Sequence, residues 1–477
     1  QLSSPDLPLS HFSLSVVESI PTLFLINQFP IIAFPRDHPQ LCVTMMGNKI
    51  IPQVMWPRLV ASKLLRKRLG STNFVADFPS NDIDSFKDDV PSSLGQPSLS
   101  ADSFFGAHKD SHNYKVFVST WNVGGVAPRE DIDMEDWLDT GDNLCDIYVL
   151  GFQEIVPLKA SNVLGSENNK ISMKWNSLIR EALNKKTKEG RAIGRSDINI
   201  PNDFRCVISK QMVGIMVSVW IRSDLLPYVR HPSVSCVGCG IMGCLGNKGA
   251  VSVRFQLHET SFCFICCHLA SGGREGDQHF RNSDVADILS RTSFPRGRSL
   301  GLPRKILDHD RVILLGDLNY RISLPETTTR SLVDQRDWNS LLENDQLRTE
   351  LLNGQILEGW HEGPVDFNPT YKYYLNSDVY FGCAEGRKGE KCRAPAWCDR
   401  IIWYGGGLKQ HIYTRGESKF SDHRPVKAIF CAEVDAQSLK GLQRLFLSER
   451  FNQLNFEVSS PRLLLADERS SFQIIKT

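Results

Sequence analysis

Short apolar runs, each closed by polar residues, recur along the chain from Tyr114 onward. Runs of about five to eight residues that are rich in Val, Ile and Phe are typical of buried β-strands. We therefore predict strands at Lys115–Trp121, Asp146–Phe152, Gly214–Ile221, Ala250–Leu257, Phe262–Leu269, Arg311–Leu318, Arg400–Tyr404 and Val426–Cys431. Helical stretches separate some of these runs, at Ser172–Lys186, His279–Leu289 and Thr328–Asn344. Strands with interspersed helices predict a layered α/β domain.

The residues before Tyr114 follow other patterns. Residues 15–34 are apolar but are interrupted by polar and proline residues, whereas a membrane helix needs about 20 clean apolar residues. We expect residues 1–45 to be a non-native upstream segment, with translation starting at Met46. Residues 46–78 are predicted to form a basic helical segment, which is either a solvated surface helix or a peripheral contact with an anionic membrane.

The remaining boundaries follow from composition. Residues 79–113 are rich in Ser, Asp, Gly and Pro, which predicts a flexible linker. The strand-rich region 114–432 is predicted to be the large folded domain, and residues 433–477 a C-terminal tail.

Composition excludes several classes of protein. The hydrophobic content of 41% and charged content of 23% are those of an ordinary globular protein. A net charge of +1 provides no overall attraction for nucleic acid or anionic membranes, so anions must be bound by local clusters. The 13 cysteines lie mostly in apolar runs, which favours a reducing compartment over a disulfide framework.

Polar residues that can perform chemistry lie next to six of the predicted strands. They are Asn122, Glu154, His268, the pair Asp317 and Asn319, Asp399, and the pair Asp422 and His423. A single Asp at a strand end is usually a turn or capping residue. Because α/β proteins build their sites at sheet ends, six such segments together predict one functional site.

These residue types together suit phosphoryl transfer to water. Glu154, helped by Asn122, offers oxygen ligands to Mg²⁺, and such a metal polarises a phosphoryl oxygen. Asp317 is the candidate that deprotonates water, and Asn319 positions that water. His423, with its tautomer fixed by Asp399, and His268 are candidate donors to the phosphoryl group.

Eight sequence blocks resemble the signatures of the inositol polyphosphate 5-phosphatases, in the family's order. They are STWNVGG (119–125), GFQEIVPL (151–158), LGNKGAVSVRF (245–255), CHLASG (267–272), GDLNYRI (316–322), NPTYKY (368–373), RAPAWCDRI (393–401) and FSDHRPV (420–426). Residues 46–65 also resemble the start of plant members of this family. The wider group is the endonuclease/exonuclease/phosphatase superfamily.

The resemblance implies a four-layer sandwich of two packed mixed β-sheets flanked by helices. It also implies Mg²⁺ dependence and direct attack by water. The substrate would be the 5-phosphate of inositol 1,4,5-trisphosphate, of phosphatidylinositol 4,5-bisphosphate, or of both, with a role in phosphoinositide signalling. We expect a cytoplasmic protein, with peripheral plasma-membrane contact or a nuclear location left open, and the sequence does not determine its oligomeric state.

The resemblance also assigns binding residues. Asp422 lies beside the metal site. Tyr371, Lys372, Lys391 and Arg393 contact the 4-phosphate next to the scissile group. Asn247 and Lys248 contact the inositol ring or its 1-phosphate side. Fixed cations suit a substrate with several phosphates because they form charge-assisted hydrogen bonds.

Three alternatives stay open. A cysteine-dependent phosphatase needs Arg six positions after its Cys; CCHLASGGR looks suggestive, but none of the 13 cysteines meets that spacing. A superfamily nuclease would keep the catalytic residues but needs a broad basic groove. A non-catalytic phosphoinositide-binding protein would use only the binding residues.

A zinc site at Cys236, Cys239 and Cys244 is disfavoured because no second cysteine pair has suitable spacing nearby.

Overall fold

The computed structural model describes residues 72–77 and 110–436, apart from 131, 142, 165–168, 193–202, 297–300 and 383–392. The chain divides into two units, residues 1–55 and 56–477, and all described residues belong to the second. The predictions for residues 1–45, for most of the helical segment 46–78 and for most of the linker and tail concern residues outside the described ranges. No helix in the described part is long and apolar enough to span a membrane.

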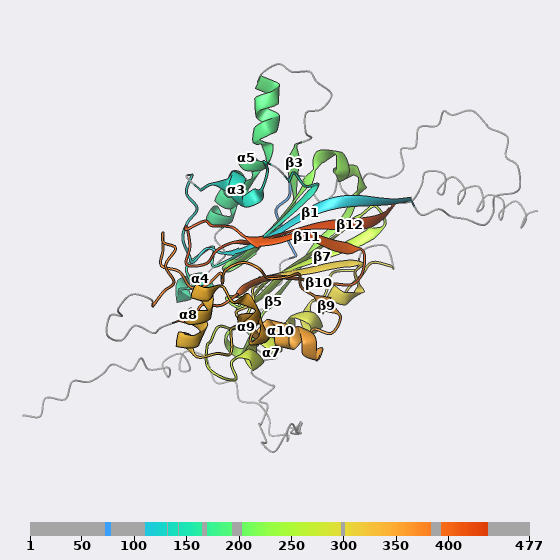
Figure 1. Ribbon diagram of the computed structural model, residues 1–477. Helices are drawn as coiled ribbons and strands as arrows, with labels where there is room; N and C mark the ends of the chain where they lie inside the picture. The colour runs from blue at the N-terminus through green and yellow to red at the C-terminus, as the bar shows by residue number, and fades with distance from the viewer. Residues whose placement is uncertain are drawn as a thin grey trace, which may run out of the picture. The chain divides into compact units, whose positions relative to one another are not determined.

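Two six-stranded sheets form the centre of the second unit (Figure 1). The first has the order β11-β12-β1-β2-β4-β3 and the second the order β5-β6-β7-β8-β10-β9. The strands are β1 (Asp110–Asn122), β2 (Ile147–Gln153), β3 (Phe204–Met212), β4 (Ile215–Arg222), β5 (Val229–Gly238), β6 (Gly249–Leu257), β7 (Thr260–His268), β8 (Arg311–Asp317), β9 (Trp360–His361), β10 (Asp399–Tyr404), β11 (Leu408–Arg415) and β12 (Val426–Ala436).

The inner faces of the two sheets pack on each other through β-branched and aromatic side chains. Val118 and Val149 of the first sheet share one buried cluster with Val253, Phe264 and Leu315 of the second. Strands buried on both faces need continuous apolar runs, and β2 and β7 are buried at every position. The apolar runs in the sequence therefore signal this two-sheet core.

Helices cover the outer faces. The helices are α3 (Met134–Leu138), α4 (Ala160–Leu164), α5 (Lys170–Ala192), α6 (Ile241–Cys244), α7 (Gln278–Arg291), α8 (Glu326–Gln335), α9 (Trp338–Glu343) and α10 (Gln346–Asn353), with 3₁₀ turns at Ser223–Tyr228 and Ile306–Asp308. Trp137 and Trp175 pack α3 and α5 on the first sheet, and Val285 and Leu347 pack α7 and α10 on the second. This confirms the four-layer sandwich (Figure 1).

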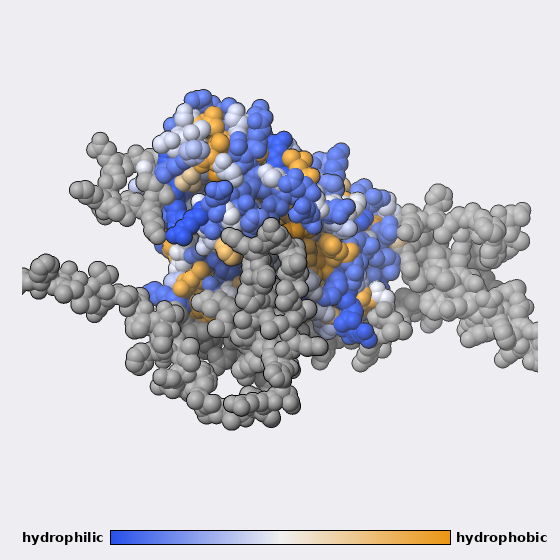
Figure 2. Space-filling view, turned by 90° about the horizontal axis from the view of Figure 1, so that it is seen from below, coloured by the Kyte–Doolittle hydropathy of each residue, from blue (hydrophilic) through white to orange (hydrophobic). Residues whose placement is uncertain are grey.

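The outer surface is largely polar in the view of Figure 2, with apolar residues interspersed. Such scattered apolar positions are normal for a protein surface and carry no argument by themselves.

Several element boundaries differ from the sequence prediction. The predicted helix 328–344 is two helices, because Arg336 takes a left-handed backbone (φ 56°) that ends α8 and Asp337 then accepts a hydrogen bond from the Ser340 amide at the start of α9. β1 begins four residues before Tyr114, inside the predicted linker, and β12 ends at Ala436. Residues 72–77 are not helical; Val75 pairs with Ser209 of β3.

Candidate active site

The polar residues predicted at strand ends meet at one end of the two sheets. The parallel pair β1 and β2 ends at Asn122 and Gln153, with Glu154 next, and the parallel pair β7 and β8 ends at His268 and Asp317. Parallel strands end at the same edge, so these side chains are delivered together. Asp399 opens β10 opposite Asp317, and His423 precedes β12.

Asn122 links the two carboxylates of the cluster. Its Nδ2 donates to Asp317 Oδ2 at 2.9 Å and to Glu154 Oε1 at 3.5 Å, while its Oδ1 accepts from the Gly124 amide at 3.0 Å. The amide oxygen thus faces the backbone of Gly124, and the amide nitrogen faces the carboxylates. In this orientation Asn122 positions the carboxylates of Glu154 and Asp317, and its own oxygen does not point with theirs as a third ligand for a metal ion.

Asp317 is held as a carboxylate. Its Oδ1 accepts from the Asn319 amide at 3.1 Å, and His268 Nε2 lies 3.3 Å from its Oδ2. Burial alone would raise the pKa of Asp317, but the hydrogen bond of His268 and the charge of His423 outweigh burial and hold this pKa well below its usual range. Asp317 is thus ionised at neutral pH, and its oxygens can accept a hydrogen bond from water.

The Asn319 side chain is fixed between two other loops. Its Nδ2 donates to the Leu269 carbonyl at 3.1 Å, and its Oδ1 accepts from Arg321 Nη2 at 2.6 Å. Arg321 also lies 4.5 Å from the centre of the Tyr371 ring. Sequence reasoning missed Arg321, although its position two residues after Asn319 in GDLNYRI was a usable signal.

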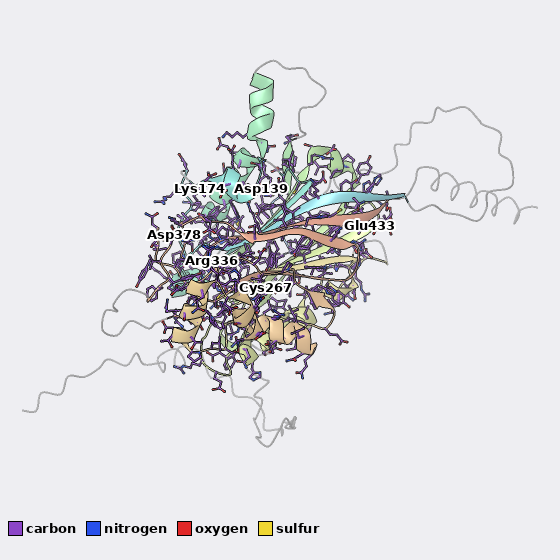
Figure 3. All side chains as sticks on the ribbon, in the orientation of Figure 1. Asp139, Lys174, Cys267, Arg336, Asp378 and Glu433 are labelled. Atoms are coloured by element: carbon purple, nitrogen blue, oxygen red, sulfur yellow. The ribbon has the colours of Figure 1, made fainter. Side chains whose placement is uncertain are left out.

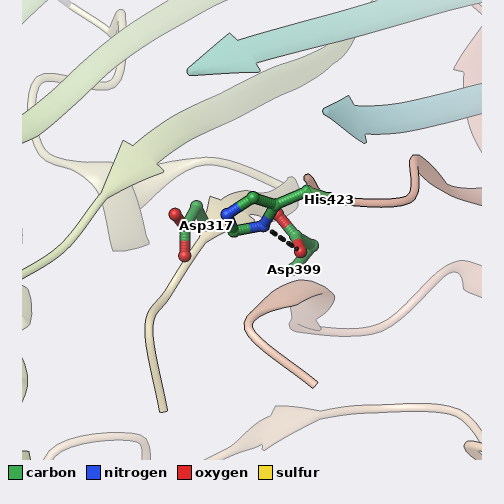
Figure 4. A group of neighbouring side chains, drawn as sticks. All are labelled: Asp317, Asp399 and His423. Carbon is green, nitrogen blue, oxygen red and sulfur yellow. Dashed lines mark hydrogen bonds and ion pairs between the residues drawn. The ribbon is translucent and has the colours of Figure 1, made fainter. Parts of the chain in front are cut away.

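His423 and Asp399 form the predicted dyad. The His423 ring lies between the carboxyl groups of Asp317 and Asp399, and its Nδ1 is 2.9 Å from Asp399 Oδ2 (Figure 4). Burial would lower the pKa of His423, but the Asp399 carboxylate raises that pKa to about 9. Burial raises the pKa of Asp399, and the Thr370 hydroxyl, which donates to Oδ2 at 2.6 Å, favours its ionised form. Nε2 of His423 therefore carries a proton and faces Asp317.

His268 lies beside Lys248 within the same cluster. Its Nε2 contacts the Lys248 ammonium and lies 3.8 Å from Glu154 Oε1. Burial, followed by repulsion from Lys248, lowers the pKa of His268, which favours a neutral ring. Burial also lowers the pKa of Lys248. Lys248 was expected on the inositol-ring side of the substrate, but its ammonium group contacts His268 within the catalytic cluster. Asn247, which precedes it in the chain, is half-buried.

The predicted 4-phosphate residues are only partly placed. The Tyr371 ring lies 4.6 Å from that of His423, and Lys372 forms an ion pair with Asp422. Arg393 is exposed, and Lys391 falls outside the described residues. Asp422, predicted beside the metal, is therefore neutralised by a residue predicted to bind substrate.

The backbone is strained at two of the site residues. Glu154 (φ 54°) and Asn319 (φ 57°) both adopt the left-handed region, which costs a residue other than glycine about 1–3 kcal/mol. Gly316 (φ 154°) has no room for a side chain, because a Cβ there would lie 2.1 Å from the Cys267 carbonyl oxygen. The left-handed backbone at Glu154 and Asn319, and the close packing of Gly316 on Cys267, thus set the directions of the Glu154, Asp317 and Asn319 side chains.

Cys267 is unsuited to nucleophilic catalysis. Its side chain, labelled in Figure 3, is fully buried, and burial raises the pKa of this thiol well above its ordinary value. Because the thiolate is the nucleophile, the cysteine-dependent alternative is rejected. Cys239 belongs to the cysteine trio for which a zinc site was disfavoured, and its Sγ lies 3.9 Å from the Asp284 carbonyl oxygen.

Comparison with known proteins shows the family to which a chain with this site belongs. The endonuclease/exonuclease/phosphatase family 2 matches residues 119–429. Type IV inositol polyphosphate 5-phosphatase 9 of Arabidopsis thaliana is 64% identical over 412 residues, covering 85% of this chain and 98% of its own length. Type I inositol polyphosphate 5-phosphatase 8 of the same plant is 46% identical, covering 82% and 89%. The chain belongs to the inositol polyphosphate 5-phosphatase family.

A solved structure extends the comparison to this 5-phosphatase's fold. The inositol polyphosphate 5-phosphatase domain of SPsynaptojanin, in complex with inositol (1,4)-bisphosphate and calcium, is 29% identical with a TM-score of 0.60, and the match covers 84% of this chain and 97% of that one. The family identification confirms the predicted resemblance and rejects the nuclease alternative. The 5-phosphatase is a phosphoric monoester hydrolase by family.

The donor set of this 5-phosphatase fits a hard cation. The Glu154 carboxylate, 29% exposed, and the buried Asp317 carboxylate contact the same two nitrogens, Asn122 Nδ2 and His268 Nε2. Ligand atoms of Asp317, Asp399 and His423 also lie within 4.8 Å of one another. His423 Nδ1 contacts Asp399 Oδ2, whereas Asp399 Oδ1 is buried without a hydrogen-bond partner, and Glu154 is the partly exposed carboxylate of the group. Oxygen donors suit Mg²⁺ or Ca²⁺.

Proposed function

We propose that this chain removes the 5-phosphate from inositol head groups that also carry a 4-phosphate, using Mg²⁺ and direct attack by water. The observation that carries the proposal is the pairing of an ionised Asp317 with the His423–Asp399 dyad across a single cluster (Figure 4). One group can take a proton and the other can give a hydrogen bond, which is what hydrolysis of a phosphate monoester requires.

Asp317 is the base in this proposal. Two N–H groups, from Asn122 and Asn319, donate to its two oxygens and fix their direction, and His268 Nε2 lies 3.3 Å from Oδ2. Each oxygen has two lone pairs, so a water molecule can still be bound and deprotonated. Asn319 adds its own side chain to the positioning of that water.

His423 and His268 are the hydrogen-bond donors. Asp399 and Thr370 fix the His423 ring, so its Nε2 is preorganised to donate to a phosphoryl oxygen. Lys248, in contact with His268, adds positive charge at the same place. Groups that need no reorganisation stabilise the charge that develops during transfer.

Glu154 is the residue proposed to hold Mg²⁺, with Asn122 positioning its carboxylate and Asp422 nearby. When bound, the ion polarises the phosphoryl oxygens and neutralises charge on the departing oxygen.

The substrate class follows from the cations around Tyr371. Lys372 and Arg393 are proposed to bind the 4-phosphate by charge-assisted hydrogen bonds. Inositol 1,4,5-trisphosphate and phosphatidylinositol 4,5-bisphosphate share this head group, and both are proposed substrates.

Removal of divalent ions tests the metal. EDTA should stop phosphate release and added Mg²⁺ should restore it, because Glu154 then regains its cation. Glu154→Gln should raise the Mg²⁺ concentration needed for half-maximal release by about tenfold or more, and should weaken the Mg²⁺-dependent shift in thermal unfolding.

The matched control is Glu343→Gln, since Glu343 is exposed on α9. It should leave both readouts unchanged. Phosphate release that survives EDTA, or a Glu154→Gln variant with an unaltered Mg²⁺ requirement, would contradict the proposal.

A further inference from the structure

Arg330 of α8 is a half-buried arginine away from the reacting groups. Its guanidinium Nε donates to Glu326 Oε1 at 2.9 Å, one turn earlier in the helix. Its Nη2 donates to two backbone carbonyls, of Phe381 at 2.6 Å and of Arg393 at 2.9 Å. The arginine side chain is only 16% exposed. Arg330 therefore joins α8 to two separate points of the chain.

Phe381 is in contact with the predicted 4-phosphate residues. Its amide donates to the Lys372 carbonyl at 2.8 Å, and the Lys372 ammonium lies 5.4 Å from the centre of its ring. The same ammonium lies 5.6 Å from the ring of Tyr371. The position of Phe381 therefore helps to set where the Lys372 ammonium stands.

Arg393 leads into the segment that pairs with Tyr371. Three residues later, Ala396 exchanges two backbone hydrogen bonds with Tyr371, at 3.2 and 2.9 Å. Holding the Arg393 carbonyl fixes the direction in which this segment approaches Tyr371. Arg330 thus holds both flanks of the pair Tyr371 and Lys372.

We propose that Arg330 is a specificity-determining positioning residue, which aligns Phe381 and Arg393 so that the site recognises the phosphate next to the scissile one. The inference rests on the proposed function. Arg330 contacts neither Asp317 nor His423 in the interactions described above, so its loss should weaken recognition of the neighbouring phosphate and leave the chemical step intact. Displacement of a binding group by about 1 Å costs up to about 100-fold in rate.

The test compares two soluble substrates, inositol 1,4,5-trisphosphate and inositol 1,5-bisphosphate, which lacks the 4-phosphate. Arg330→Met keeps an unbranched apolar stem and removes the donors of the side chain. We expect kcat/KM for the trisphosphate to fall about 10- to 100-fold, mostly through KM. The kcat/KM for the bisphosphate should change less than about threefold, so the preference for the 4-phosphate collapses.

Two further variants support the comparison. Arg330→Lys keeps a charged donor and should recover part of the preference. Arg336→Met is the matched control, since Arg336 is an exposed arginine at the end of the same helix (Figure 3) and should leave both substrates unchanged.

An equal loss on both substrates would show that Arg330 only supports the fold, and no loss on either would show that it has no role; both results overturn the inference. A wild-type protein that does not distinguish the two substrates also overturns it. A wild-type protein that hydrolyses neither substrate refutes the proposed function instead. The same comparison is then made on binding, by calorimetry, where an unchanged trisphosphate affinity in Arg330→Met overturns the inference.

Discussion

Replacing Asp317 with asparagine should reduce phosphate release by about 10²- to 10⁴-fold while leaving head-group binding nearly intact. The variant keeps the shape of the side chain, and its one amide oxygen can still accept from either the Asn319 amide or Asn122 Nδ2. It removes the negative charge that accepts the proton from water. The loss should therefore appear in kcat rather than in KM.

The measurement is a steady-state phosphate-release assay, paired with calorimetric titration of inositol 1,4,5-trisphosphate. Asp334→Asn is the matched control, because Asp334 is exposed on α8. Turnover of Asp317→Asn within about tenfold of wild type would remove Asp317 from the role of base. A large loss of binding with unchanged kcat would make it a binding residue. If wild type also binds without turnover, the non-catalytic alternative is correct.

Arg400→Met should lower the free energy of unfolding by about 3–5 kcal/mol, the largest effect on stability that we expect from a single substitution. The Arg400 side chain is fully buried and forms ion pairs with Asp345 at 3.0 Å and with Glu362 at 2.6 Å. Methionine fills a similar space but leaves both carboxylates buried without their cation. Glu362 also accepts from the Tyr413 hydroxyl at 2.8 Å, so the disturbance spreads to β11.

Urea denaturation measures this change, with Arg336→Met as the exposed control. The triple variant Arg400→Met, Asp345→Asn, Glu362→Gln should recover much of the lost stability, because it removes the buried charges together with their partner. A midpoint for Arg400→Met close to wild type, or a triple variant that is less stable than the single one, would contradict this account of the network.

Arg400 also shows how stability and chemistry are joined here. It directly follows Asp399, whose carboxylate orients His423. Asp345 caps the N-terminus of α10, and the next residue, Gln346, accepts from the Arg321 amide at 3.0 Å and from Arg281 at 2.7 Å. The N-terminus of α10 therefore holds the chain at both Asp399 and Arg321, on either side of the reacting groups.

The sequence predicted the strands that are buried on both faces, because a continuous apolar run is the signal of such a strand. It missed β3, β5, β11 and the two-residue β9. β5 and β11 are less regular and alternate with exposed positions, and β3 includes polar residues such as Lys210 and Gln211 that are nevertheless buried. The break between α8 and α9 depends on a left-handed backbone at Arg336, which nothing in the residue type announces.

The strand-end residues were predictable because parallel strands deliver their last residues to one edge. The contacts between them were not. Residue types do not reveal that Asn122 turns its nitrogen to the carboxylates, that Lys248 reaches His268, or that Lys372 pairs with Asp422. Thr370 and Arg330 were missed for the same reason: each acts through a partner that is distant in the sequence.

The central claim is hydrolysis at the 5-position, and identification of the product tests it most directly. Purified protein is incubated with inositol 1,4,5-trisphosphate and Mg²⁺, and the product is identified by phosphorus NMR. The account predicts inositol 1,4-bisphosphate and one equivalent of free phosphate, with neither formed in EDTA. Release of the 1- or 4-phosphate, or binding without any release, would contradict it.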